Sequence, residues 1–232
     1  MISVIIPAFN EEENIKELLP LLDKLAKGFN VEIIVSIGEC VGNYTDCIKE
    51  SSNARLVSKG RKGRAKQMNI GAFMSKGNTL VFLHADVRPP HGFFKDIQET
   101  LSQDYEAGFF SYRFDKDNFF LRMNASFTGK DGLFTGGGDQ CLFIKKSVFE
   151  DLNGFDEEQI IMEDFEFFKR MKNKKISYTI IQNDLIVSAR KYIKNSYTRV
   201  NLTNLMLVVL FKLGAPSHKL KSLHDKCLRL NY

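Results

Sequence analysis

The first ninety or so residues alternate short runs of continuous apolar residues with stretches of helical periodicity, and this alternation limits the fold more than any other feature. A strand that is apolar at every position is typical of a parallel sheet that helices cover on both faces. We therefore expect strands at Ile2–Pro7, Val31–Ile37, Ala54–Ser58 and Thr79–His84, and helices at Glu11–Gly28, Asn43–Ser52 and Arg64–Lys76. An α/β fold follows from this order of elements.

The second half of the chain is less regular. A strand at Ala107–Phe114 precedes a polar and aromatic crossing segment at Asp115–Lys130. Further strands are expected at Cys141–Ile144, Ser177–Ile181 and Leu185–Ser188, and helices at Lys146–Leu152, Glu163–Lys174, Ser196–Leu213 and His218–Arg229. We predict a three-layer α/β/α domain with a mixed, mainly parallel sheet over residues 1–190, followed by a helical tail over residues 191–232.

The composition excludes several classes of protein. A net charge of +5 is too small to indicate nucleic-acid binding on its own. The four cysteines show no metal-binding spacing and are typical of free thiols in a reducing compartment. The N-terminal sequence lacks the basic region of a signal peptide, and no apolar run reaches 18 residues. We expect a cytoplasmic protein without a membrane span and without a nucleic-acid partner.

Polar clusters follow three of the expected strands, at the sheet edge where open α/β folds bind ligands. The first is Pro7–Glu11, and the third is His84–Pro90. In the third, Asp86 ends a buried apolar strand and therefore needs a cation or several hydrogen-bond donors. Two interpretations stay open: Asp86 binds a hard cation such as Mg²⁺ together with substrate phosphates, or it caps the helix that starts near Pro90.

The second cluster is a basic loop with five cationic residues between Lys59 and Lys66 and two glycines, directly before a helix. Cations beside a helix N-terminus form a phosphate site. The alternative is a solvated basic loop, and the position next to Asp86 favours phosphate.

Two further features lie in the second half. Gly136–Gly138, followed by Asp139 and Gln140, permits close approach of the backbone to a ligand, or else forms a flexible turn. The acidic pair Glu163 and Asp164 starts a helix. Acids favour the first turn of any helix, but this pair could also supply a general base.

Taken in order, these segments resemble a family 2 glycosyltransferase with the GT-A fold. The matching pieces are SVIIPAFNEEENI, GRAKQMNIGA, FLHADVRPP, GDQCLFIKKSVFEDLNGF, MEDFEFFKRMK and VSARKY, which span residues 2–210. More narrowly, the chain is similar to the bacterial branch of radical-SAM/selenodomain-associated glycosyltransferases. The resemblance implies an inverting enzyme that moves a sugar from a nucleoside-diphosphate donor to a hydroxyl acceptor, with a nucleotide-binding half at residues 1–90 and a donor-sugar and acceptor half at residues 91–190.

The resemblance also implies roles for individual residues. Asp86 would bind Mg²⁺ or Mn²⁺ bridging the diphosphate, with His84 replacing the first acid of the family's metal motif. Asp164 would be the general base, with Glu163 as its neighbour. The donor-sugar and acceptor side would be shaped by Gly138, Asp139 and Gln140. The nucleotide-sugar would be bordered by Pro7, Ala8, Asn10, Glu11, Arg64 and Gln67, with Asn69 behind them.

One departure from the family pattern concerns the nucleotide base. Ser36 stands where family members usually carry an Asp that reads the base, and Glu39 replaces a serine. Ser36 brings a hydrogen bond but no charge, so the base is left open, with a UDP-sugar as the first expectation. The alternative function is a catalytically weakened sugar-nucleotide-binding or scaffold protein on the same fold. A nucleotidyltransferase and a dinucleotide-binding dehydrogenase are disfavoured because no glycine-rich loop follows the first strand.

The C-terminal segment from Arg190 to Tyr232 is strongly basic. It contains nine Lys or Arg residues and one acid, Asp225, which is a net charge of +8. Its longer expected helix, Ser196–Leu213, is dense in apolar residues but too short to span a membrane. Three arrangements are open: the helix packs on the domain, it contacts an anionic surface at the inner face of the membrane, or it forms a homodimer.

Overall fold

The computed structural model describes residues 1–38, 44–51, 53–58 and 63–228. These residues form an eight-stranded sheet with the order β3-β2-β1-β4-β7-β6-β8-β5. The strands are β1 (Ile2–Ala8), β2 (Val31–Ile37), β3 (Ala54–Ser58), β4 (Thr79–Phe82), β5 (Val87–Arg88), β6 (Ala107–Phe114), β7 (Phe143–Lys145) and β8 (Tyr178–Val187). Strands β1 to β4 are mutually parallel, and β7 and β5 run antiparallel to their neighbours. The predicted mixed, mainly parallel sheet is therefore confirmed.

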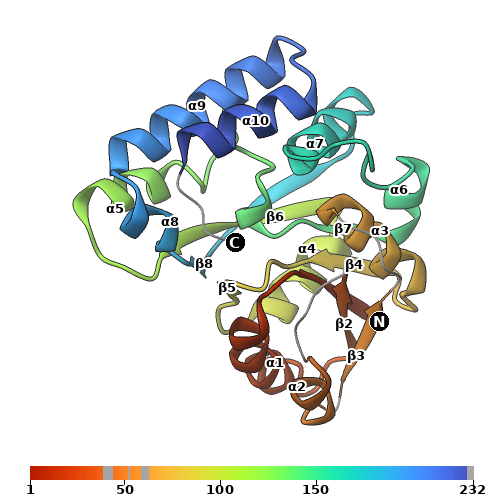
Figure 1. Ribbon diagram of the computed structural model, residues 1–232. Helices are drawn as coiled ribbons and strands as arrows, with labels where there is room; N and C mark the ends of the chain where they lie inside the picture. The colour runs from red at the N-terminus through yellow and green to blue at the C-terminus, as the bar shows by residue number, and fades with distance from the viewer. Residues whose placement is uncertain (39–43, 52, 59–62, 229–232) are drawn as a thin grey trace.

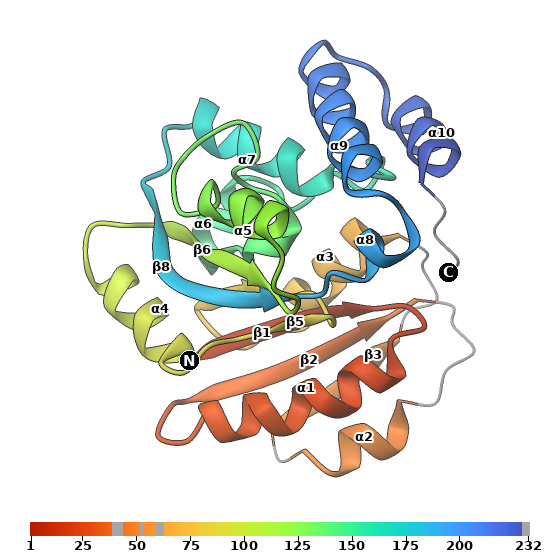
Figure 2. The ribbon, with the colours of Figure 1, turned by 90° about the vertical axis from the view of Figure 1, so that its left-hand side faces the viewer.

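Helices cover both faces of this sheet, which gives the predicted three layers (Figures 1 and 2). The described helices are α1 (Glu12–Leu25), α2 (Thr45–Lys49), α3 (Arg64–Met74), α4 (Phe93–Ser102), α5 (Phe119–Ser126), α6 (Lys146–Asp151), α7 (Glu163–Asn173), α8 (Arg190–Lys194), α9 (Tyr197–Lys212) and α10 (Ser217–Cys227). Val4 and Ile6 of β1 face a core that includes α1 and α4. Ile5 faces the opposite core, which includes α3, α6 and α7. Successive side chains of β1 thus pack alternately into the two cores, one on each face of the sheet.

A cluster of phenylalanines joins the end of β4 to the first turns of α7. The ring centroids of Phe155 and Phe167 are 4.8 Å apart, and those of Phe82 and Phe155 are 4.9 Å apart. Phe149 packs against both Phe155 and Phe167. Such ring pairs contribute about 0.5–1.5 kcal/mol each beyond their burial. The cluster therefore holds two segments of the candidate site, the end of β4 and the start of α7, against each other.

Several elements differ from the sequence-based predictions. The two short strands expected at Ser177–Ile181 and Leu185–Ser188 are one strand, β8, whose pairing with β6 shifts register between Phe110 and Tyr112. The crossing segment Asp115–Lys130 contains helix α5. Strand β4 ends at Phe82 and not at His84, so His84 lies in the connection to β5.

The two long C-terminal helices end close to where the sequence predicts. Figure 1 shows α9 and α10 beside each other, at the opposite end of the molecule from α1 and α2. None of the described helices is both long and apolar enough to cross a membrane.

Candidate active site

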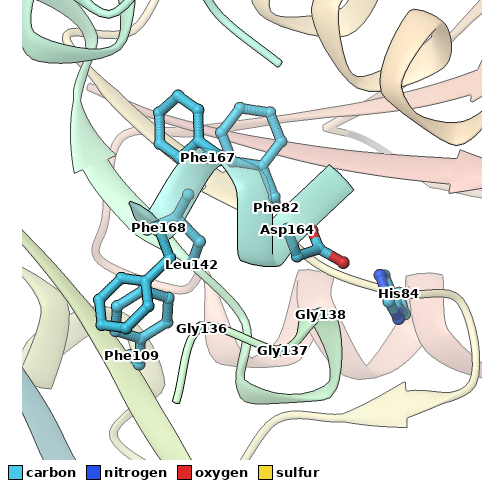
Figure 3. Close-up of a pocket in the computed structure, with 10 residues that line it drawn as sticks. All are labelled: Phe82, His84, Phe109, Gly136, Gly137, Gly138, Leu142, Asp164, Phe167 and Phe168. Carbon is cyan, nitrogen blue, oxygen red and sulfur yellow. The ribbon is translucent and has the colours of Figure 1, made fainter. Parts of the chain in front are cut away.

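The loop Gly136–Gly138 brings His84 and Asp164 together (Figure 3). A Cβ atom on Gly138 would lie 2.3 Å from His84 Cε1 and 2.5 Å from Asp164 Oδ2. Real Cβ atoms do not approach other atoms so closely, so position 138 accepts only glycine in this arrangement. The three glycines were expected to let the backbone approach a ligand closely. In the structure, the backbone at Gly138 instead packs closely against the side chains of His84 and Asp164.

The acidic pair lies at the first turn of α7. Met162, directly before it, has a left-handed backbone with φ = 67°, a conformation that bulky residues rarely adopt. Glu163 is buried, and its carboxylate lies 3.2 Å from Arg64 Nη1. Asp164 Oδ2 lies 4.0 Å from the same nitrogen. Arg64 thus counters the charge of the pair, which directly follows the unusual turn at Met162.

The environment of Asp164 favours its protonated form. Burial, followed by repulsion from the neighbouring Glu163, raises the pKa of Asp164 to about 7, against the opposing effects of His84 and Arg64. A carboxyl group with a pKa near neutral pH can accept a proton from a hydroxyl group and release it again. This is the chemistry of a general base.

Asp139 stands in the opposite environment. Its carboxylate lies 3.7 Å from His84 Nδ1 and 3.6 Å from Lys191 Nζ. Burial alone would raise the pKa of Asp139, but the Lys191 ammonium and the His84 imidazole hold it well below its usual range. Asp139 is therefore a permanent negative charge that fixes Lys191 beside His84.

A second cationic residue of α8 faces the other two acids of the site. Arg190 Nη2 lies 2.7 Å from Glu11 Oε1 and 3.1 Å from Asp86 Oδ2. Glu11 is held in turn by Asn14, which donates to its carboxylate, and by its own backbone N–H, which donates to the Tyr44 hydroxyl. The start of α8 thus joins the ends of β1 and β4 through one guanidinium group.

The end of β1 and its neighbours form the edge where a nucleotide is expected. Pro7 and Ala8 pair with Ser36 and Ile37 of β2. Gln67 is buried, and its side-chain amide donates to the carbonyl of Ala8 over 3.0 Å, so it ties α3 to the end of β1. Ser36 is 1% exposed, and its hydroxyl has no hydrogen-bond partner within the described part of the chain. A buried hydroxyl without a partner is costly, which makes Ser36 a candidate donor to a ligand.

The remaining predicted residues lie around this edge. Asn10 is exposed, with φ = 53°. Gln140 is buried and bridges the Gly136 N–H and the Thr128 carbonyl, so it shapes the glycine loop from behind. Asn69 bonds the backbone of Phe155 in both directions. Glu39 and most of the basic loop, at Lys59–Lys62, fall outside the described residues.

Sequence reasoning assigned no role to Arg190 and Lys191, although VSARKY is part of the resemblance. The available signal was two adjacent cations directly after the last strand of the sheet. The cavity that His84 and Asp164 line with the glycine loop measures only about 10 Å³, room for about one water. This cavity is therefore too small to hold a sugar or a nucleotide.

Comparisons with known proteins agree with this fold. The mannosyltransferase PcManGT from Pyrobaculum calidifontis, solved with GDP-Man and Mn²⁺, superposes with a TM-score of 0.69 at 16% identity, covering 97% of this chain and 68% of that one. A fragment of TarS from S. aureus, solved with UDP, gives a TM-score of 0.66 at 14% identity, covering 96% of this chain and 69% of the fragment. Both likenesses concern the fold, which is the GT-A glycosyltransferase fold, as predicted.

Family membership follows from the sequence. Residues 3–177 match the family described as Glycosyl transferase family 2, so the chain belongs to this family. A stretch of 93 residues is 29% identical to a dolichol-phosphate mannosyltransferase from Pyrococcus furiosus. The match covers 38% of this chain and 26% of that protein, so the chain aligns with about a quarter of its relative's length.

Proposed function

We propose that this protein transfers a glycosyl group from a nucleoside-diphosphate sugar to a hydroxyl acceptor, with inversion at the anomeric carbon. The observation that carries the proposal is that an acidic environment lies on one side of His84 and a cationic one on the other. Asp164 has a pKa near 7 on one side, and Arg190 and Lys191 supply two positive charges on the other. The family to which the chain belongs supports the same reaction.

In this reaction Asp164 accepts the proton of the acceptor hydroxyl. The acceptor oxygen forms a bond to the anomeric carbon on the face opposite the diphosphate. The bond between that carbon and the diphosphate oxygen breaks, and the diphosphate leaves with the electron pair. Arg190 and Lys191 balance the charge that develops on it, since preformed cations stabilise a leaving group that becomes more negative. Burial and then the neighbouring Glu163 keep the pKa of Asp164 high, and Arg64 lies beside both acids.

A divalent cation fits this edge only when the donor is bound. Within the described residues, no group of three His, Cys, Asp or Glu side chains gathers to hold a metal ion. Mg²⁺ is often held by one or two carboxylates together with substrate phosphates, so Asp86 can serve as the protein ligand. When bound, the cation would neutralise part of the diphosphate charge. Arg190 would then turn from Asp86 to the phosphate oxygens.

The donor is a UDP-sugar or a GDP-sugar. One structural neighbour was solved with UDP and another with GDP-Man, and the first expectation from the sequence was UDP. Ser36, with its buried hydroxyl, is proposed to bond the base. Pro7, Ala8 and Asn10 would line the nucleotide, and Gly138 the donor sugar, while Gln140 would support the glycine loop from behind.

The test is a calorimetric titration with UDP, GDP, CDP and dTDP and their common sugars, with and without Mn²⁺. The proposal expects binding of one nucleotide series, and Asp86→Ala should remove the dependence of that binding on Mn²⁺. Release of the nucleoside diphosphate from the bound donor, measured in parallel, reports turnover. A folded protein that binds none of these donors would contradict the proposal, and binding without turnover would favour the scaffold alternative.

A further inference from the structure

The second half of helix α9, from Leu205 to Phe211, is apolar on all sides although only one face of the helix is covered. Its inner face buries Val200, Leu207 and Val208. Its outer face carries Leu202, Leu205 and Val209, followed by Leu213 after the last turn. The spacing of these four residues places them along one stripe. A helix that is apolar all round is normally surrounded by other apolar groups, so the outer stripe lacks the cover that its composition predicts.

Helix α5 presents a second apolar stripe beside the first. Phe119, Phe120, Met123 and Phe127 lie on its outer side, while Leu121 alone is buried. Together, the eight side chains on the two stripes are each between 40% and 78% exposed. We call this surface, made of Phe119, Phe120, Met123, Phe127, Leu202, Leu205, Val209 and Leu213, the apolar face.

Direct contacts join the two halves of the apolar face. The ring centroids of Phe120 and Tyr197 are 4.9 Å apart, and the Tyr197 hydroxyl donates to the Phe120 carbonyl. Asn124 of α5 donates to Asn201 of α9 over 2.8 Å. Figure 1 shows α5, α8 and the start of α9 side by side at one end of the molecule. The two stripes therefore start from neighbouring segments in direct contact, and exposed apolar side chains gathered in this way mark interaction sites.

The charges around the apolar face indicate what covers it. Exposed cations lie on the same elements: Arg122 on α5, Lys194 on α8, and Arg199 and Lys212 on α9. The whole C-terminal segment carries a net charge of +8. Two copies of this chain that met through the face would bring these cations together, which opposes self-association. Anionic lipid headgroups complement the cations, and the acyl region complements the phenylalanine and leucine side chains.

We propose that the apolar face and its cations bind the surface of an anionic phospholipid bilayer. The protein lies on the membrane, with α5 and α9 inserted at the level of the headgroups. Helix α8, which contacts the candidate site through Arg190 and Lys191, ends three residues before α9 begins. Binding through the face therefore holds the candidate site close to the lipid surface. The contact does not depend on transfer, so it stands or falls separately from the proposed reaction.

The experiment is co-sedimentation of the full chain with phosphatidylcholine vesicles that contain or lack about one third phosphatidylglycerol. We expect pelleting with the anionic vesicles at low salt, and a marked fall at 0.5 M salt. Phe127→Ser combined with Leu202→Ser should lower the partition coefficient about tenfold, because two apolar anchors are lost. Phe73→Ser combined with Leu133→Ser, which alters exposed apolar residues outside the face, is the control and should pellet as the wild type does.

The charge contribution has its own pair of variants. Lys194→Glu combined with Lys212→Glu should lower partition about tenfold or more, since each cation near the surface contributes roughly 1 kcal/mol. Lys24→Glu combined with Lys27→Glu, at the far end of the molecule, makes the same change in net charge and should have a small effect. Protein that stays in the supernatant with anionic vesicles at low salt would overturn the proposal. So would a dimer in sedimentation velocity that the Phe127 and Leu202 variant breaks.

Discussion

The start of α7 and the start of α8 face the same candidate site with opposite electrostatics. At α7, two acids share one cation, Arg64, and the pKa of Asp164 is raised to about 7. At α8, two cations meet Glu11, Asp86 and Asp139, and the pKa of Asp139 lies well below its usual range. The surroundings thus shift the pKa values of two aspartate carboxyl groups in opposite directions, which suits them to different roles. The α7 region is suited to take up a proton, whereas the α8 region keeps its acids ionised beside two cations.

The strongest test of this contrast is Asp164→Asn. The amide keeps the size of the side chain but cannot take up the proton of the substrate hydroxyl. The single-turnover rate of transfer should therefore fall about 10²–10⁴-fold. Donor affinity, measured by calorimetry, should change less than threefold, because the α8 region is untouched. Glu158→Gln, an exposed change near the same helix, is the control and should keep the wild-type rate. An unchanged rate in Asp164→Asn would remove the general-base assignment.

The next test moves the two regions relative to each other. In Gly138→Ala the new methyl group must displace His84, Asp164 or the loop itself. A misplacement of about 1 Å can cost 10²-fold in rate, and we expect a loss of about that size in kcat. Gly132→Ala is the matched control, because the nearest atom to its added Cβ lies 4.0 Å away. Equal rates in the two variants would show that His84 and Asp164 do not need this packing.

A third test concerns the α8 region alone. Arg190→Met removes the guanidinium group that faces Glu11 and Asp86. The negative charges of these two acids would then repel the diphosphate without a neighbouring cation to offset them. We expect about tenfold weaker binding of the nucleoside diphosphate in the absence of metal, measured by calorimetry, because a charge-assisted hydrogen bond contributes about 1.5–3 kcal/mol. Lys194→Met, on the same helix, should bind as the wild type does. Equal affinities would contradict the role of Arg190 as an anion-binding residue.

The regular half of the fold could be predicted well from the sequence. The bounds of β2 and β3 agree with the predictions, and β2 is buried at five of its seven positions. Helix α5 was missed because it buries only Leu121, so the apolar periodicity of a packed helix is absent. Strand β8 was divided in two because Gln182–Asp184 has the polar composition of a turn. In the structure this stretch stays in the strand, and Asp184 accepts a hydrogen bond from Ser111.

The site could be predicted in part. Motif order brought Asp86, Gly138 and Asp164 into one hypothesis, and the structure places His84 and Asp164 against Gly138. The partners of Arg190 could not be found in this way, since Glu11 lies 179 positions away in the sequence. Such a pairing depends on how β1, β4 and the start of α8 meet in space, and no local pattern records it.

The smallest predicted effect concerns stability. The folded protein raises the Asp164 pKa from its ordinary value of 3.8 to about 7, so between these values the folded state binds more protons than the unfolded state. Stability therefore falls as pH rises from about 4 to about 7, and the penalty is full above pH 7. Asp164→Asn removes this contribution, since Asn does not titrate. The variant should therefore be more stable than the wild type at pH 8, and near pH 4 the difference should vanish. Urea unfolding at the two pH values measures both, and a variant that is less stable than the wild type at pH 8 would show that the Asp164 carboxyl is not strained by its surroundings.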